Sequence, residues 1–370
     1  MKIGILFSSL IFSAALFLTS CKEDIELSGD AKETAVVYGL LNQADSIHYI
    51  KINRAFISET NSLITAQIPD SNYFQNVEAT IKEVVNGSVT RTWTLSDTII
   101  DNKEPGVFFA PEQKVYYFTT DLGAGQALIA NSNTEYQLDV NINEGEFVVS
   151  GKTALLTGMS IQSPSALSSF TFASSNVSVN GYANTPVKCK KGQASVVDIS
   201  LIVSIDEFIG GTPTTKSFKW RLADLKADDI VGNDIIASAS GNTFYTLIRQ
   251  NCTNNPAITR RRLKSIRVEY TGGSEELNKY LTINKPSSSL AQNKPTYTNL
   301  TATNDRKVVG LFSARNTVAI TKNAWTQTGS LYIRAIDLNS TRHLSIGSLT
   351  GDLFFCSDNP ADLNESFYCN

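Results

Sequence analysis

The sequence predicts a mainly β protein, with an N-terminal immunoglobulin-like or fibronectin-like β-sandwich followed by a second β-rich domain that contains one short helix. Three observations support this fold class. Short runs alternate between apolar and polar residues with the period of two that half-buried strands show. An Asn86-Gly87 pair separates two such runs, and Tyr136 lies in a strand pattern typical of a tyrosine corner. The length of 370 residues favours two domains, which we expect to span residues 31–156 and 157–370.

The sandwich strands follow from local patterns in the first half of the chain. Asn86-Gly87 can adopt the positive φ angles of a type I′ hairpin turn, whose twist matches paired strands. The hydroxyl of Tyr136 is expected to return to the upstream backbone, as it does in immunoglobulin-like sandwiches. The predicted strands are 35–41, 46–52, 77–85, 88–95 and 133–140, with a closing strand at 147–149 and 153–155.

The second domain has weaker signals. Residues 160–184 are rich in Ser, Thr and Asn, which predicts a linker or loosely ordered edge strands. A helix is predicted at 274–281, because Ser274 can cap it, acidic residues follow in the first turn, and Leu277 and Leu281 share a face. Strands are predicted at 194–203, 217–222, 243–248, 265–270, 308–312 and 331–336, with a turn at 210–213.

The first twenty residues have the layout of a lipoprotein signal peptide. Lys2 is followed by an uncharged apolar run over residues 3–18, which is too short for a comfortable membrane span. The run ends in Leu18-Thr19-Ser20-Cys21, which resembles a bacterial lipobox. Residues 1–20 are therefore expected to be removed, and the Cys21 thiol to carry a diacylglyceryl group. An ordinary signal peptide followed by a coincidental cysteine is the alternative.

A second signal follows the cysteine. Lys22, Glu23 and Asp24 resemble the export signal that sends Bacteroidota lipoproteins to the outer face of the outer membrane. A solvated acidic tether is the alternative interpretation of the same residues. Residues 21–30 are expected to link the lipid flexibly to the first strand. The protein is thus expected on the outer membrane, lipid-anchored and facing the cell exterior.

The other four cysteines predict disulfides. An even number of cysteines in an exported chain favours two bridges, for which three connectivities are possible. Cys356 and Cys369 are expected to pair across a short loop, which leaves Cys189 and Cys252 to pair by elimination. A zinc site is disfavoured because there is no Cys-x-x-Cys and neither histidine stands at ligand spacing from a cysteine.

Catalytic signatures are missing from the sequence. It contains no Walker loop, dinucleotide-binding glycine pattern, zincin motif, EF-hand loop or nucleophile elbow. Neither His48 nor His343 belongs to a recognised sequence pattern with an acid or nucleophile, and each is expected to be a surface or edge-strand residue. Carboxylates from distant strands could still form a hydrolase site, although no pair stands out. No metal and no cofactor are predicted.

Two charged clusters have alternative interpretations. Asp224, Asp228, Asp229 and Asp234 could hold Ca²⁺, but an acidic turn is favoured. Residues 260–264 with Arg267 form a basic cluster, which is interpreted as a solvated strand edge or, alternatively, as a patch for an acidic partner or lipopolysaccharide phosphates. The net charge of −3 gives no reason to expect nucleic acid as a partner.

The three tryptophans lie in alternating strand patterns. Core positions are favoured for all three, over the alternative of platforms that bind sugars or peptides. These residues are Trp93, Trp220 and Trp325.

Three features together resemble a known family. They are the lipobox, the segment Val36-Val37-Tyr38-Gly39-Leu40-Leu41, and the segment Gly310-Leu311-Phe312-Ser313-Ala314-Arg315. The chain resembles Bacteroidota outer-membrane lipoproteins grouped as a domain of unknown function (DUF4249). Members of that family are often encoded beside TonB-dependent receptors, so the resemblance implies a partner role in uptake. It implies no catalytic residues.

Together these features predict a non-enzymatic accessory or ligand-binding partner of a TonB-dependent transporter. Its expected partners are outer-membrane lipid, through the acylated Cys21, and a receptor barrel. A cell-surface adhesin or structural envelope lipoprotein is the first alternative, and a surface hydrolase is the second.

Overall fold

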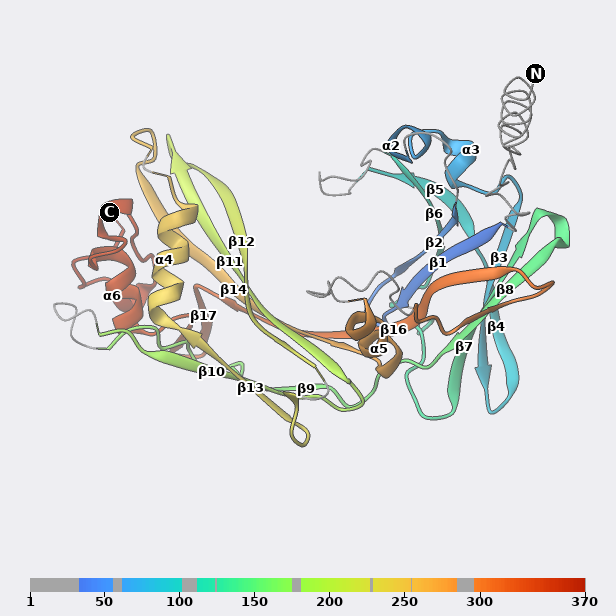
Figure 1. The fold of residues 1–370 in the computed structure, drawn as a ribbon. Coiled ribbons are helices and arrows are strands. Elements are labelled where there is room, and N and C mark those ends of the chain that lie inside the picture. Colours follow the sequence, from blue (N-terminus) through green and yellow to red (C-terminus); the bar gives the residue numbers. More distant parts are fainter. Residues whose placement is uncertain are drawn as a thin grey trace, which may run out of the picture. The chain divides into compact units, whose positions relative to one another are not determined.

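A computed structural model describes residues 33–55, 62–101, 112–123, 125–174, 181–226, 229–253, 255–284 and 296–369 (Figure 1). The predicted signal peptide and tether, together with Cys21, Lys22, Glu23 and Asp24, lie outside these residues, and so does Asp228. Strands dominate the described part, which confirms the prediction of a mainly β protein.

The first eight strands form two packed sheets with the strand order of an immunoglobulin-like sandwich. One sheet has the order β1-β2-β6-β5 and the other β8-β7-β3-β4, which correspond to strands A-B-E-D and G-F-C-C′ of that fold. The strands are β1 (Thr34–Leu41), β2 (Ile47–Ala55), β3 (Val77–Val85), β4 (Ser88–Thr94), β5 (Ser96–Ile100), β6 (Gln113–Thr119), β7 (Thr134–Ile142) and β8 (Phe147–Thr153). Short helical turns lie at α2 (Ser62–Thr65), α3 (Pro69–Asn72) and Asn143–Gly145.

Two local predictions in the sandwich are confirmed. Asn86 and Gly87 have φ angles of 50° and 82°, as a type I′ turn requires. The Tyr136 hydroxyl accepts a hydrogen bond from the Ile129 backbone N–H at 2.6 Å and donates one to Glu83 Oε2 at 2.8 Å. Because Tyr136 and Glu83 are almost completely buried, this tyrosine corner fixes the chain entering β7.

Two late strands extend the sandwich sheets. β15 (Leu300–Ala302) pairs with β8, and the first half of β16 (Lys307–Asn323) pairs in parallel with β1. At Gly310, φ is +121° and a Cβ would lie 1.9 Å from the Val37 carbonyl oxygen, so glycine permits this pairing. Leu300 and Phe312 belong to the same hydrophobic cluster as Val140, although the sequence assigned them to the second domain.

The second half of β16 joins another part of the same eight-stranded sheet, whose full order is β12-β11-β14-β16-β1-β2-β6-β5. Smaller sheets have the orders β13-β10-β9 and β17-β18. The strands are β9 (Ser160–Ser163), β10 (Asn184–Lys190), β11 (Val196–Ile209), β12 (Thr212–Leu225), β13 (Asp234–Ser240), β14 (Arg260–Gly273), β17 (Trp325–Thr328) and β18 (Leu331–Arg334). The helices are α4 (Gly241–Asn251), α5 (Glu275–Ile283) and α6 (Leu338–Ile346), with 3-10 turns at Gly351–Leu353 and Pro360–Asp362.

The helices of this region differ from the prediction. The helix predicted at 274–281 is confirmed as α5, with the Ser274 hydroxyl accepting from the Leu277 N–H. The strand predicted at 243–248 is wrong, because these residues lie in α4, whose Phe244, Tyr245 and Ile248 form a buried face. α6 was not predicted, so the described part of this region contains three α-helices instead of one.

The polar stretch 160–184 is better ordered than a linker in its described part. Residues 160–163 form the edge strand β9, in agreement with the second of the two predicted possibilities. Phe170 and Phe172 are fully buried and stack on each other, and Phe172 stacks on Phe244 with ring centroids 4.1 Å apart. Two large aromatic side chains among serines and threonines therefore anchor this segment to the core.

One of the two predicted disulfides is present. Cys356 and Cys369 are bonded, as their spacing predicted. The Cys189–Cys252 pairing is wrong, because both residues are buried free thiols. Each packs as a small apolar side chain within the hydrophobic cluster of this region, and burial raises the pKa of the Cys189 thiol to about 12.

Candidate functional site

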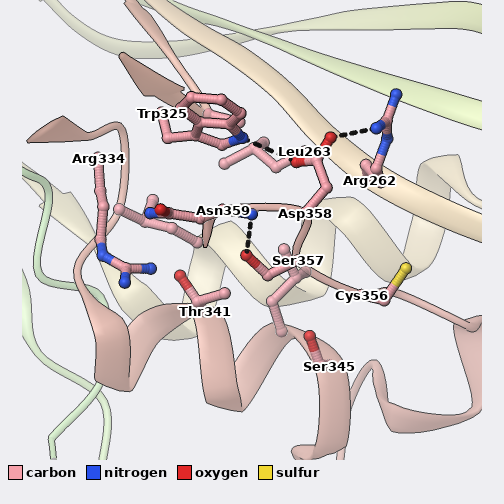
Figure 2. Close-up of a pocket in the computed structure, with 13 residues that line it drawn as sticks. Arg262, Leu263, Trp325, Arg334, Thr341, Ser345, Cys356, Ser357, Asp358 and Asn359 are labelled. Atoms are coloured by element: carbon pink, nitrogen blue, oxygen red, sulfur yellow. Dashed lines mark hydrogen bonds and ion pairs between the residues drawn. The ribbon is translucent and has the colours of Figure 1, made fainter. Parts of the chain in front are cut away.

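The candidate site is a small pocket beside the disulfide-bonded C-terminal segment (Figure 2). Its cavity volume is about 30 Å³, which is room for about two water-sized groups. The lining comes from the start of β14, the strands β17 and β18, helix α6 and the segment after it. The lining residues are Arg262, Leu263, Ala324, Trp325, Arg334, Ile336, Thr341, Leu344, Ser345, Cys356, Ser357, Asp358 and Asn359.

Two local structures hold the pocket walls in place. Helix α6 begins after Asp337, whose side chain accepts a hydrogen bond from the Ser340 N–H at 2.8 Å. The C-terminal segment is attached to β14 by backbone hydrogen bonds on either side of Arg261, which donates to the Phe354 carbonyl and accepts from the Cys356 N–H. The disulfide then closes this segment onto Cys369, so that Cys356 and the residues after it have a fixed course.

The charged side chains of the pocket are paired with one another. Asp358 accepts from the Trp325 indole N–H at 2.9 Å and forms an ion pair with Arg262. Arg334 forms two hydrogen bonds with the fully buried Asp362, at 2.5 and 2.6 Å. Because two guanidinium groups face two carboxylates, the pocket wall has no net charge.

Two buried polar groups of the pocket have no hydrogen-bond partner among the described residues. They are Nδ2 of Asn359, a residue that is 2% exposed, and Oγ of Ser345, a residue that is 6% exposed. Figure 2 shows Asn359 between Trp325 on one side and Thr341 and Ser345 of α6 on the other. Leaving a buried polar group without a hydrogen-bond partner costs about 1–3 kcal/mol of folding free energy. A hydrogen-bonding partner would therefore stabilise each of the two groups.

A larger hollow of about 290 Å³ lies at the sandwich, where β3, β5, β6 and β7 contribute residues. Its lining is polar and includes Glu78, Asp97, Lys114, Asn141 and Glu144. Lys114 Nζ lies 3.2 Å from Asp97, which partly neutralises the acidic side chains. The carboxylates of Glu78, Asp97 and Glu144 are exposed, whereas Oδ1 of Asn141 is buried without a hydrogen-bond partner among the described residues.

The predicted Ca²⁺ ligands are only partly within the described residues. Asp224 forms an ion pair with Arg221, and Asp229 accepts from the Lys226 backbone N–H at 3.2 Å. Among the described residues, no three acidic, histidine or cysteine side chains converge in a way that could hold a metal ion.

The basic cluster is solvated only in part. Residues 260–263 pair with β11 on one side, and Arg261 forms a bridge with Phe355 of the C-terminal segment on the other. The side chains of Lys264 and Arg267 are 50% and 45% exposed, whereas Arg261 is 1% exposed. Its guanidinium donates to Glu207 at 2.8 Å and to the carbonyls of Leu353 and Thr253 at 2.9 and 2.6 Å. The prediction of solvated side chains is therefore wrong for Arg261, which is an internal anchor for the C-terminal segment, and agrees with the exposed Lys264 and Arg267.

Both histidines are buried, which corrects the prediction of surface or edge positions. His48 is 2% exposed in β2, which lies inside its sheet, and its Nε2 is 3.1 Å from Thr120 Oγ1. Its ring stacks on Phe118 with centroids 4.7 Å apart. His343 on α6 is 4% exposed and lies near the rings of Tyr182 and Tyr245.

The burial of His48 predicts a loss of stability in mild acid. Desolvation lowers the pKa of His48, with a smaller opposing effect of Asp45, so the unfolded chain binds a proton at a higher pH than the folded chain. The stabilisation is complete above the ordinary histidine pKa of about 6.5 and is lost as the pH falls toward the folded-state value. Urea denaturation at pH 7.5 and 5.5 should show a smaller loss for His48→Gln than for wild type; equal losses would contradict this assignment.

The tryptophans have different environments. Trp93 and Trp220 are half-buried and pack against the hydrophobic clusters, as predicted. Trp325 instead lines the pocket and donates to Asp358. Local sequence patterns did not reveal this role of Trp325, because its partners lie on other elements. Near the site, the sequence offered the spacing of Cys356 and Cys369, which predicted their disulfide.

Comparisons with known proteins identify no family for the chain. No family model and no curated protein matches it. A solved structure, the C-terminal globular domain of an oligosaccharyltransferase from Pyrococcus abyssi, is similar with 9% identity and a TM-score of 0.20. The similarity covers 65% of this chain and 45% of that chain, and at this TM-score it carries no argument. Within the described residues, no helix has the length and apolar character needed to cross a membrane.

Proposed function

We propose that this protein is a non-enzymatic binding lipoprotein of the outer membrane, anchored through an acylated Cys21 and acting as an accessory to a TonB-dependent transporter. The observation that carries the proposal is Leu18-Thr19-Ser20-Cys21 placed directly after the apolar run of residues 3–18. Lys22, Glu23 and Asp24, which follow, support a position on the outer face of that membrane.

The distance between the anchor and the first strand supports a role beside a membrane partner. β1 begins at Thr34, so the chain from Cys21 to this strand can reach at most roughly 45 Å when fully extended. A lipid at Cys21 would confine the folded part to a thin layer beside the membrane. The resulting effective concentration would allow a weak protein contact to suffice.

The chemistry of the pocket supports binding in preference to catalysis. Asp358 and Asp362 are each held by an arginine and by a further donor, the Trp325 indole and the Ser357 hydroxyl. Each carboxylate is thus held in place by ion pairs and hydrogen bonds within the protein. The unpartnered groups of Asn359 and Ser345 are neutral hydrogen-bonding groups that can hold a ligand.

Co-purification tests the proposal. The tagged full-length chain, extracted from outer membranes in mild detergent, should emerge with a receptor barrel. The Cys21→Ser variant, mixed with the same detergent extract, should retain this barrel if the contact is made by the folded part. A chain that emerges alone from both preparations would contradict the transporter role.

A further inference from the structure

We infer that the free edge of strand β12 binds an extended, acidic segment of a partner protein, which adds to the eight-stranded sheet as a further strand. β12 (Thr212–Leu225) is one of the two outer strands of that sheet and pairs with β11 only (Figure 1). An outer strand has free backbone donors and acceptors on one side, and extended peptides bind at such edges. The inference goes beyond the proposed function and does not depend on the lipid anchor.

The turn at the start of β12 shows which of its residues direct their backbone groups away from β11. Gly210 and Gly211 have φ angles of 60° and 91°, and they form the two-residue turn between the strands. In such a hairpin the residues that flank the turn, Ile209 and Thr212, are a hydrogen-bonded pair, and the pairs that follow alternate between non-bonded and bonded. The free backbone groups therefore belong to alternate residues. Before the register shift beyond Arg221, these are Pro213, Thr215, Ser217, Lys219 and Arg221.

Pro213 agrees with this assignment. Proline has no N–H, so in a sheet it lies where no ladder hydrogen bond is needed. Pro213 pairs with Phe208 as a non-bonded residue, and its missing N–H thus faces away from β11. From Thr215 to Arg221 there is no further proline, and the free edge has its N–H groups there. Among the described residues, no backbone hydrogen bond besides those to β11 reaches residues 212–225.

The charges along this edge favour an acidic partner. Lys216 and Lys219 form no ion pair with any described residue, and Lys219 is exposed. Arg221 pairs with Asp198 and Asp224, so Lys219 has the uncompensated charge among the residues whose backbone groups face outward. Opposite charges that face each other across paired strands stabilise the pairing. An acidic residue opposite Lys219 would supply this partner.

The same charges disfavour a second copy of this chain at the edge. Two paired β12 strands would bring Lys216, Lys219 and Arg221 of both copies into one narrow ribbon, where like charges repel. A lysine on an outer strand commonly protects a sheet against self-association in this way. An acidic segment is the partner that this protection does not exclude.

The inner face of β12 indicates the other half of the partner's pattern. Phe218 and Trp220 pack against the hydrophobic cluster but are only half-buried. Their pairing residues on β11, Val203 and Leu201, are fully buried, so burial decreases toward the free edge. Apolar side chains of an added strand would cover the two aromatic rings. Because successive side chains of a strand point to opposite faces, the expected segment alternates acidic and apolar residues.

Fluorescence anisotropy with labelled synthetic peptides and the purified full chain tests the inference. The acidic probe has the sequence Thr-Glu-Val-Glu-Val-Glu-Thr and should bind saturably. The basic probe, with lysine in place of each glutamate, should bind at least about tenfold more weakly. N-methylation of the Glu amides or of the Val amides blocks one side of the acidic peptide's backbone. One of these two peptides should lose binding and the other should keep it, because only one side faces β12.

Matched variants place the binding on β12. Ser217→Pro removes an outward N–H without removing a bond to β11, and should weaken binding of the acidic peptide by about tenfold or more. Ser217→Ala keeps this N–H and loses the hydroxyl contact with Ser204, so it should bind as wild type does. Lys219→Glu should reverse the preference between the acidic and basic peptides. Circular dichroism checks the fold of each variant; if Ser217→Pro does not fold, the N-methylated peptides and Lys219→Glu still decide the matter.

Several outcomes would overturn the inference. They are no saturable binding of the acidic peptide, equal binding of the acidic and basic peptides, and unchanged binding in Lys219→Glu or in folded Ser217→Pro. A dimer seen by sedimentation and dissociated by Ser217→Pro would assign the edge to a second copy instead. The synthetic peptides probe only the edge of β12, so failure here leaves lipidation and the transporter role untouched.

Discussion

Replacement of Cys21 by serine is expected to release the protein from the membrane fraction into the soluble fraction. Attachment of the diacylglyceryl group requires a thiol, and the serine hydroxyl does not replace it in this reaction. Each buried methylene of a lipid chain contributes about 0.8 kcal/mol to membrane binding, and two chains suffice for stable anchoring. The effect should therefore be close to all-or-none, measured by fractionation and immunoblotting.

A nearby substitution provides the control for this experiment. Ser28→Ala changes a residue in the same predicted tether without altering the lipobox, and should remain with the membrane. Recovery of Cys21→Ser in the membrane fraction at the wild-type level would contradict a lipid anchor at this residue.

Replacement of Arg261 by methionine is expected to reduce the free energy of unfolding by about 3–5 kcal/mol. The side chain is 1% exposed and binds Glu207 and the carbonyls of Leu353 and Thr253. Methionine keeps much of the volume but leaves a carboxylate and two carbonyl groups without their donor. Urea denaturation at neutral pH should show a lower midpoint with an unchanged slope.

Arg267 on the same strand is the matched control. It forms an ion pair with Glu269, but its side chain is 45% exposed. A surface pair of this kind contributes about 0–1 kcal/mol, so Arg267→Met should change stability little. Equal losses in the two variants would show that Arg261 is not a buried anchor.

The sandwich could be predicted from sequence because its signals are local. Asn86-Gly87 specifies its turn through the backbone conformations that these two residues tolerate, and Tyr136 lies in a regular alternating strand. The contribution of β16 could not be predicted, because its parallel pairing with β1 joins residues far apart in the chain. Only the structure shows that Gly310 is where the two backbones approach closely.

Tertiary contacts explain the errors elsewhere. Residues 243–248 include aromatic and β-branched side chains, which favour strands, yet Phe244 stacks on Phe172 and the Tyr245 hydroxyl donates to the Ser340 carbonyl at 3.0 Å. His48 was expected at the surface, but it lies on the inward face of β2 while its apolar neighbours Ile47 and Tyr49 are exposed. The alternation was correct, and the face that points inward could not be identified from it.

The candidate site depends even more on tertiary structure. Arg262, Trp325, Ser345 and Asn359 come from four different segments, and none of them belongs to a motif with recognisable spacing. The disulfide of Cys356 indicated that the C-terminal segment is fixed, but not which strand it lies against. The pocket is lined by single side chains that only the packing of the chain brings together. Sequence alone therefore could not reveal the pocket.

Mass spectrometry of the mature N-terminal peptide tests the anchored-lipoprotein account most directly. The account predicts that the protein purified from membranes begins at Cys21, with residues 1–20 removed and the mass of a diacylglyceryl group on the sulfur. A peptide that begins elsewhere, or an unmodified Cys21 thiol, would contradict it.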